Sequence, residues 1–190
     1  MTTSNIRKSY GLLPDEVSAE NQFIKYCDEV AGVLGRGKNK VADIFIFEIA
    51  KTETGLGTIE DKTAGAGMGI CQHDKFPFED NQRRYKDNDI SLILSKWGLD
   101  MRTIKWDMLK DNIFISIIAT RLHFKPFSQD IPGNMVGRAR YWKKYYNTFK
   151  GKGTVKHYLK MNGFDMSKYN PSMEIKSSKE KCEWSSEHLA

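Results

Sequence analysis

A single apolar run at residues 41–55, VADIFIFEIAKTETG, restricts the folds open to this chain more than any other segment. Its apolar side chains occupy most sides of a helix instead of one stripe, which is typical of a helix buried all round. The β-branched residues alone would permit a strand, but a length of about 13 residues favours a helix. Gly55 is a typical residue to follow the end of a helix. We therefore expect a buried central helix that ends at this glycine.

Glu53 lies in the last turn of the expected helix, two residues before the closing glycine. Limited access to water and the negative end of the helix dipole both favour the neutral form of a carboxyl group in this position. A general acid needs such a neutral carboxyl group to protonate a leaving oxygen near neutral pH. A solvated glutamate at a helix end is the alternative interpretation. Glu48 is a second candidate acid, but it lies in the middle of the helix.

A glycine-rich segment follows at residues 58–75, with Gly65, Gly67 and Gly69 among short apolar residues. This pattern is more typical of a tight hairpin or small sheet than of a helix, and the polar residues 76–89 after it are predicted to form a loop. The expected fold is therefore α+β but mainly α, with a small β-hairpin or sheet beside the central helix. Periodicity and capping residues predict further helices at residues 21–34, 90–97, 113–124 (with Asp111 or Asn112 as N-cap), 134–148 and 154–163.

The chain has 190 residues, and its 39% hydrophobic content is enough for a sizeable core. We expect an N-terminal arm at residues 1–19, one domain at residues 20–170 and a flexible, charged tail at residues 171–190. The longest apolar runs are far shorter than the ~20 residues that span a bilayer, so no membrane insertion is expected. The N-terminus has no apolar stretch typical of a secretory signal, so we expect synthesis in the cytoplasm without a signal peptide.

The net charge of +6 favours an anionic partner, such as nucleic acid, lipid head groups or an acidic cell-wall polymer. Three widely spaced cysteines indicate neither a disulfide framework nor a zinc module. The four histidines show no paired ligand spacing, so we expect no metal site and no cofactor. Cys71 and His73 could suggest a thiol nucleophile with its base. A small buried side chain that packs is the favoured interpretation of Cys71.

Three motifs, in order over residues 40–160, resemble the lytic transglycosylase and goose-type lysozyme superfamily. Glu53-Thr54-Gly55 followed by residues 65–72, GAGMGICQ, is similar to that family's Glu-Ser, variable loop and Gly-Leu-Met-Gln. Asp111-Asn112-Ile113 is similar to the family's Asn-Ile helix start. Residues 145–158, which begin YYNT and continue with spaced glycines, valine and tyrosine, are similar to its Ala-Tyr-Asn-x-Gly and Val-x-x-Tyr block.

The resemblance implies a lysozyme-like fold in which Glu53 is the catalytic acid and base. It also implies that Gln72 and the backbone of residues 69–71 line a sugar cleft, and that Tyr146 and Asn147 lie near Glu53 and the bound N-acetylmuramic acid. The substrate-binding positions that it implies are Thr54, Gly69, Ile70, Cys71, Gln72, Tyr146 and Asn147.

The chain departs from the family pattern at several of these positions. Thr54 replaces the usual serine but keeps its hydroxyl, while Ile70 and Cys71 replace leucine and methionine. Tyr145 stands where a small alanine is usual, and Gly151 comes later than the family's glycine. The last two of these departures lie at or close to the loop after residue 147.

The activity that the resemblance implies is cleavage of the β-1,4 bond between N-acetylmuramic acid and N-acetylglucosamine, with a 1,6-anhydro product. One carboxylate is enough for this lytic transglycosylase reaction. A hydrolytic muramidase of the inverting kind needs a second carboxylate about 6.5 to 9.5 Å away. Asp74 is the candidate, because residues 72–75, QHDK, are similar to the Gln-Val-Asp-Lys of goose-type lysozymes; a turn or capping aspartate is the alternative. Asp61 is a weaker candidate.

Two further interpretations come from other functional classes. A non-catalytic wall-binding or virion protein could keep the same fold. The aromatic and basic residues 138–158 would suit a single-stranded nucleic acid, but that interpretation leaves the Glu53 and glycine motifs unexplained. We therefore expect a monomer that binds peptidoglycan glycan strands and not nucleic acid. It would act on the cell wall in the periplasm or outside the cell, with delivery by a bacteriophage as one route.

Overall fold

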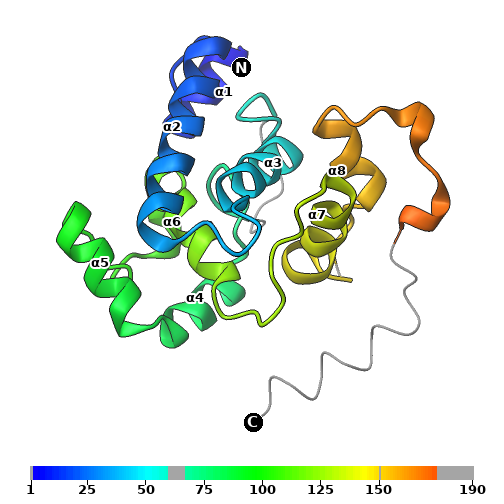
Figure 1. Ribbon diagram of the computed structural model, residues 1–190. Coiled ribbons are helices and arrows are strands. Elements are labelled where there is room, and N and C mark those ends of the chain that lie inside the picture. Colours follow the sequence, from blue (N-terminus) through cyan, green and yellow to red (C-terminus); the bar gives the residue numbers. More distant parts are fainter. Residues whose placement is uncertain (1, 60–66, 150, 175–190) are drawn as a thin grey trace. The chain divides into compact units, whose positions relative to one another are not determined.

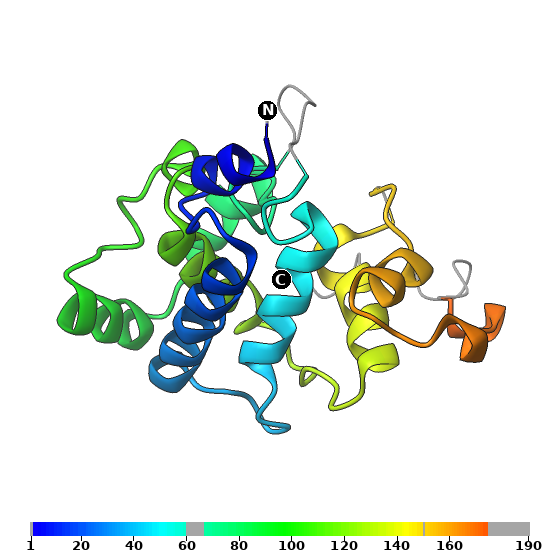
Figure 2. The same cartoon turned by 90° about the horizontal axis from the view of Figure 1, so that it is seen from above.

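The structure is a computed structural model that describes residues 2–59, 67–149 and 151–174. The chain divides into two compact units, Met1–Gly133 and Asn134–Ala190. Both units are built from helices (Figures 1 and 2), and the prediction of a mainly helical fold is confirmed. None of the helices in the described residues combines the length and apolar character needed to cross a membrane.

The described residues of the first unit form six α-helices and one 3-10 helix. Their bounds are α1 (Thr3–Ser9), α2 (Glu16–Leu34), α3 (Ala42–Thr54), α4 (Lys75–Arg84), α5 (Asp87–Trp97), the 3-10 helix Trp106–Leu109 and α6 (Ile113–Phe124). Helices α2, α3 and α6 pack against one another and form the centre of the unit (Figure 1). In α3, Phe45, Ile46 and Ile49 are fully buried, and the Phe45 ring meets that of Phe124 edge-on at 4.9 Å. The central helix is therefore buried, as its sequence predicts.

Local capping signals predict the end of α3 and the start of α6 correctly. Gly55 adopts a left-handed conformation, with φ 56° and ψ 35°, and its N–H donates to carbonyl groups in the last turn of α3. Asn112 caps α6 by accepting a hydrogen bond from Ile115 N at 3.0 Å. Helix α2 begins five residues earlier than residue 21, because Asp15 accepts a hydrogen bond from Ser18 N at 2.8 Å and caps it.

The N-terminal residues pack on the first unit. Tyr10 and Leu12 are buried, and the Tyr10 hydroxyl donates to Ile59 O at 3.2 Å. A Cβ added to Gly11 would lie 2.6 Å from Asp111 O, so the backbone here approaches the start of α6 closely. The expected boundary at residue 19 falls inside α2.

Two expectations about the segment after α3 need correction. Residues 76–89, expected to be a loop, are mostly helical. Most of them lie in α4, which buries only Phe78 and Asn81 and so shows almost no apolar periodicity, and α5 begins at Asp87. The expected β-hairpin or small sheet is not supported, because the described residues contain no strand and only an isolated bridge between Met68 and His73. Residues 60–66, part of that expectation, lie outside the described residues.

The second unit contains α7 (Met135–Trp142), a π-helical turn (Lys143–Asn147), α8 (Val155–Met161) and the 3-10 helices Met166–Lys168 and Pro171–Met173. Helix α7 packs on α8, and the rings of Trp142 and Tyr158 meet at 5.3 Å. Both rings are fully buried. The predicted helices at residues 134–148 and 154–163 are thus confirmed, with the first one changing to a π turn near its end. The predicted flexible tail at residues 171–190 falls mostly outside the described residues.

Candidate functional site

Glu53 is held in the last turn of α3, where its side chain is half-buried. It lies close enough to the Cys71 thiol for the two groups to interact electrostatically. Burial raises the pKa of Cys71 to about 12, the hydroxyls of Thr120 and Ser116 oppose this shift, and Glu53 adds to it. Cys71 is therefore a buried neutral thiol, as predicted, and Glu53 lies beside the turn that contains it.

Thr54 joins the end of α3 to this turn. Its side-chain oxygen lies 2.9 Å from Ile70 O and 3.1 Å from Ala50 O, so the single hydroxyl hydrogen is shared between the two carbonyl groups. The same oxygen accepts a hydrogen bond from Gly57 N at 3.3 Å. Thr54 is 1% exposed, which makes these bonds the means by which its polar atom is satisfied. These hydrogen bonds hold Thr54, the residue that follows Glu53, against Ile70.

The turn itself is the segment Met68–His73. The two end residues exchange backbone hydrogen bonds of 2.8 and 2.9 Å. Gly69 O accepts hydrogen bonds from the Gln72 backbone N at 3.0 Å and from its side-chain Nε2 at 2.9 Å. Gly69 has φ +74°, and a Cβ there would lie 2.5 Å from Leu109 O. Only glycine fits this position without displacing the backbone before α6.

His73 anchors the far end of the turn inside the unit. Its Nε2 lies 2.8 Å from Thr120 Oγ1, whose hydroxyl lies 2.8 Å from Ser116 O. Burial lowers the pKa of His73 to about 3, and the neighbouring His123 acts in the same direction. The imidazole is therefore neutral at physiological pH. Trp106 Nε1 donates to His73 O at 2.6 Å, which ties the turn to the segment before α6.

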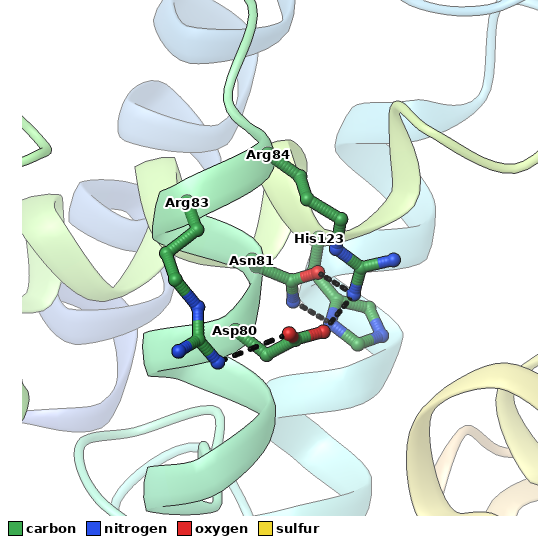
Figure 3. A network of polar contacts seen from close by, with 5 residues as sticks. All are labelled: Asp80, Asn81, Arg83, Arg84 and His123. Carbon is green, nitrogen blue, oxygen red and sulfur yellow. Dashed lines mark hydrogen bonds and ion pairs between the residues drawn. The ribbon is translucent and has the colours of Figure 1, made fainter. Parts of the chain in front are cut away.

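A second buried histidine fixes α4 against α6. Asn81 Nδ2 lies 2.7 Å from His123 Nδ1, and both side chains are buried (Figure 3). Asp80, beside Asn81 on α4, pairs with Arg83 and Arg84 at the surface (Figure 3). The bond between Asn81 and His123 helps to hold α4, a helix with one buried aromatic side chain, directly after the turn.

Asp74 follows the turn and precedes α4. It is exposed, and its side chain makes no capping hydrogen bond to the helix. Partial burial of its carboxyl group nevertheless raises the pKa of Asp74. Asp74 therefore occupies the N-cap position of α4 without a side-chain cap, and its alternative role as a turn residue stays a prediction. The Asp61 candidate lies outside the described residues.

Tyr146 and Asn147 belong to the second unit and lie in its π-helical turn. Lys143 Nζ donates to Asn147 Oδ1 at 2.7 Å and to Gly151 O at 2.9 Å. Thr148 then has a positive φ of 59° with ψ 177°, an uncommon conformation for a β-branched residue. Single π turns and strained residues of this kind are often found at functional sites. The predicted closeness of Tyr146 and Asn147 to Glu53 stays a prediction.

Glycines shape the loop that closes on Asn147. A Cβ added to Gly151 would lie 2.2 Å from Asn147 O, and one added to Gly153 would lie 2.5 Å from the Trp142 ring. Tyr145, which stands where the lytic transglycosylase pattern has a small alanine, is buried and packs on Tyr141 at 4.6 Å. The larger side chain is therefore accommodated inside the unit.

The structure thus brings Glu53, Thr54, the turn and Asp74 together in one unit. The sequence did not single out Trp106 or Lys143 as site residues. Nothing in the residues around either one shows that Trp106 bonds to His73 or that Lys143 bonds to Asn147. The spacing of Lys143 four residues before Asn147 was the one available signal.

Across residues 2–59, 67–149 and 151–174, no group of three or more His, Cys, Asp and Glu side chains is arranged to hold a metal ion. A comparison of the chain with protein-family models, with curated proteins and with solved structures finds no match.

Proposed function

We propose that this protein is a peptidoglycan lytic transglycosylase with a lysozyme-like catalytic unit, in which Glu53 is the general acid and base. The observation that carries the proposal is the hydrogen bond between the Thr54 hydroxyl and Ile70 O. It joins the two parts of the first motif in the family resemblance, Glu53-Thr54-Gly55 and the glycine-rich segment that ends at Gln72. A carboxyl group in the last turn of a buried helix is also held on a rigid element, which a catalytic group requires.

The reaction needs one carboxyl group that acts twice. Glu53 gives its proton to the oxygen that leaves with N-acetylglucosamine, and the substrate's N-acetyl group stabilises the sugar cation that forms. The carboxylate of Glu53 then takes the proton of the C6 hydroxyl of N-acetylmuramic acid, whose oxygen closes the 1,6-anhydro ring. Glu53 ends the cycle protonated, and no water is consumed.

The neighbouring groups suit this chemistry. Cys71 is neutral and buried, so it does not compete with Glu53 as a nucleophile. His73 is neutral and held by Thr120, so it positions the turn and does not shuttle protons near neutral pH. Glu53 is thus the residue of the first unit best placed for proton transfer at this turn.

A hydrolytic muramidase is the second candidate function. The position and surroundings of Asp74 favour it. Asp74 lies directly after the same turn, its carboxylate makes no capping bond, and its pKa is raised by partial burial. In this version, Asp74 would accept a proton from the attacking water while Glu53 protonates the leaving oxygen.

Mass spectrometry of the muropeptides released from purified peptidoglycan separates these candidates. A lytic transglycosylase releases products with 1,6-anhydro ends, whereas a muramidase releases products with reducing ends. Asp74→Asn should leave the rate of anhydro product formation within about twofold of the wild type, because exposed substitutions away from the reacting groups have small effects. A large loss of rate, together with reducing ends, would support the hydrolase.

The same experiment addresses the non-catalytic alternative. A folded protein that binds peptidoglycan but releases no muropeptides would contradict both enzymatic candidates. Such a result would leave a wall-binding or virion component as the function. Whether the protein is an enzyme or a wall-binding component, delivery by a bacteriophage is one proposed route to the wall.

A further inference from the structure

The positive charge of the chain is concentrated in the second unit. Residues 134–190 hold twelve Lys or Arg and five Asp or Glu, whereas residues 1–133 hold eighteen Lys or Arg and nineteen Asp or Glu. The second unit therefore carries a net charge of +7 and the first a net charge of −1. The overall charge of +6 belongs to one unit and not to the chain as a whole.

Ion pairs engage some of the cations in each unit. Several cations of the first unit pair with acidic groups, for example Arg36 with Asp28 and Asp43, and Lys125 with Asp89. In the second unit, Lys168 pairs with Asp165, but the cationic segment, residues 152–160, is different. Its three lysines, Lys152, Lys156 and Lys160, are exposed and form no ion pair with any described residue.

The geometry of α8 keeps these charges available. Lys156 and Lys160 are four residues apart in the helix and lie on one face of it. Lys156 Nζ lies 5.4 Å from the centre of the Tyr169 ring, and the Tyr169 hydroxyl donates to Glu174 at 2.8 Å. The lysine is thus placed over an aromatic ring and carries its charge at the surface.

The surroundings of the cationic segment favour one kind of anionic partner. Single-stranded nucleic acid binds where successive exposed rings stack on bases. Here the rings of Tyr141, Trp142, Tyr145 and Tyr158 are buried in the unit. Among the Phe, Tyr and Trp side chains of the described residues 138–158, only Phe149 is exposed and Tyr146 half-buried, which is too few for such a row. Under the proposed function, the substrate itself supplies anions, because its glycan strands carry peptide stems that end in carboxylates.

We propose that the cationic segment binds the peptide-stem carboxylates of peptidoglycan and holds the enzyme on its polymer. This inference rests on the proposed function for the identity of the polymer. Ammonium groups attract carboxylates over about 8 to 10 Å at physiological ionic strength, so the binding should weaken as salt is added. The lysines act in docking and not in the chemical step.

Co-sedimentation with insoluble peptidoglycan tests this inference on the full chain carrying Glu53→Gln, which prevents digestion. Lys152, Lys156 and Lys160 are changed together to Glu in one variant. A matched control variant changes Lys25, Lys96 and Lys110 to Glu, three exposed lysines of the first unit without ion pairs to described residues. Both variants change the net charge equally, and circular dichroism checks that both remain folded.

The expected result is about tenfold weaker binding for the variant of the cationic segment, and binding within about twofold of the parent for the control, given the modest contribution of each exposed charge. Peptidoglycan freed of its peptides by an amidase should bind both variants equally. Peptidoglycan freed of phosphate polymers should behave like the untreated material.

The inference would be overturned if the two variants lost binding equally, or if the parent bound peptide-free glycan as well as intact peptidoglycan. It would also be overturned if binding of the parent depended on the phosphate polymers, or if a single-stranded oligonucleotide at equal charge concentration displaced the parent from the wall. Failure of the docking inference is distinguishable from failure of the proposed function. In the first case the wild type still releases muropeptides, and in the second it binds the wall but releases none.

Discussion

Thr54 is the residue on which the candidate site depends most. It is buried and adjacent to Glu53. Its hydroxyl hydrogen bonds to Ala50 O and Ile70 O, and its oxygen accepts a hydrogen bond from Gly57 N. In the pattern that the sequence resembles, a serine at this position would supply the same hydroxyl. The resemblance points to this position, but it does not show that the hydroxyl reaches the glycine-rich turn.

Thr54→Val should therefore lower the free energy of unfolding by about 1 to 3 kcal/mol, because it leaves buried backbone groups without their partner. Thr54→Ser keeps the hydroxyl and loses one methyl group, so its cost should be about 0.8 kcal/mol or less. Urea denaturation of both variants measures the difference. Equal stability of the two variants would show that the hydrogen bonds do not hold the turn.

His73 makes a prediction about pH. The pKa of this imidazole is lowered from 6.5 in the unfolded chain to about 3 in the folded protein by burial. As the pH falls from about 6.5 to 3, the unfolded chain takes up a proton that the folded protein excludes, so His73 lowers the free energy of unfolding by up to a few kcal/mol. Above pH 6.5 it has no such effect.

Thermal unfolding between pH 3 and pH 8 measures this dependence. His73→Gln keeps an amide that can donate to Thr120 but has no group that titrates, so its loss of stability below pH 6.5 should be smaller than that of the wild type. The same slope in both proteins would contradict a buried neutral His73.

At the scale of elements, the helices that carry their own end signals could be predicted from the sequence. The left-handed Gly55 and the capping Asn112 are local features, and they place the ends of α3 and the start of α6 correctly. Helix α4 could not be predicted in this way. Its position depends on long-range bonds, such as those of Asn81 with His123 and of Gln82 with Met101 O.

The segment Met68–His73 shows the same limit. Its glycines favour a hairpin when they are considered alone, but the structure has a turn with a single bridge. Thr54 from α3, Trp106 from the 3-10 helix and Thr120 from α6 each bond to it. The turn is shaped by these long-range contacts and not by pairing with a neighbouring strand.

Gly69 tests this account of the turn. Gly69→Ala should destabilise the protein by more than about 2 kcal/mol, because a Cβ combines the cost of a positive φ with overlap against the backbone. Gly98 is the matched control, since it has a similar φ of +67° but nothing within 4 Å of an added Cβ. Gly98→Ala should cost about 1 to 2 kcal/mol. Equal losses in denaturant midpoints would mean that Leu109 O does not confine the turn.

At the scale of the whole molecule, the proposed acid Glu53 and most of the net positive charge lie in different units. The first unit holds Glu53 and the turn, and the second holds the π-helical turn with Tyr146 and Asn147 and most of the positive charge. The total charge of the chain predicts an anionic partner. It does not reveal that the charge is confined to one unit, because that depends on where the chain divides.

The central claim is that Glu53 performs the chemistry, and the release of anhydro-muropeptides tests it most directly. Wild type, Glu53→Gln and Glu79→Gln are incubated with purified peptidoglycan, and the 1,6-anhydro products are counted by mass spectrometry. Glu79 is an exposed glutamate on α4 and serves as the control for loss of a carboxylate.

The account predicts that the wild type and Glu79→Gln release anhydro products at similar rates. It predicts that Glu53→Gln, folded and with peptidoglycan binding retained, is slower by about 10² to 10⁴-fold, the contribution typical of a general acid or base. Near-normal release of anhydro products by Glu53→Gln would contradict the claim.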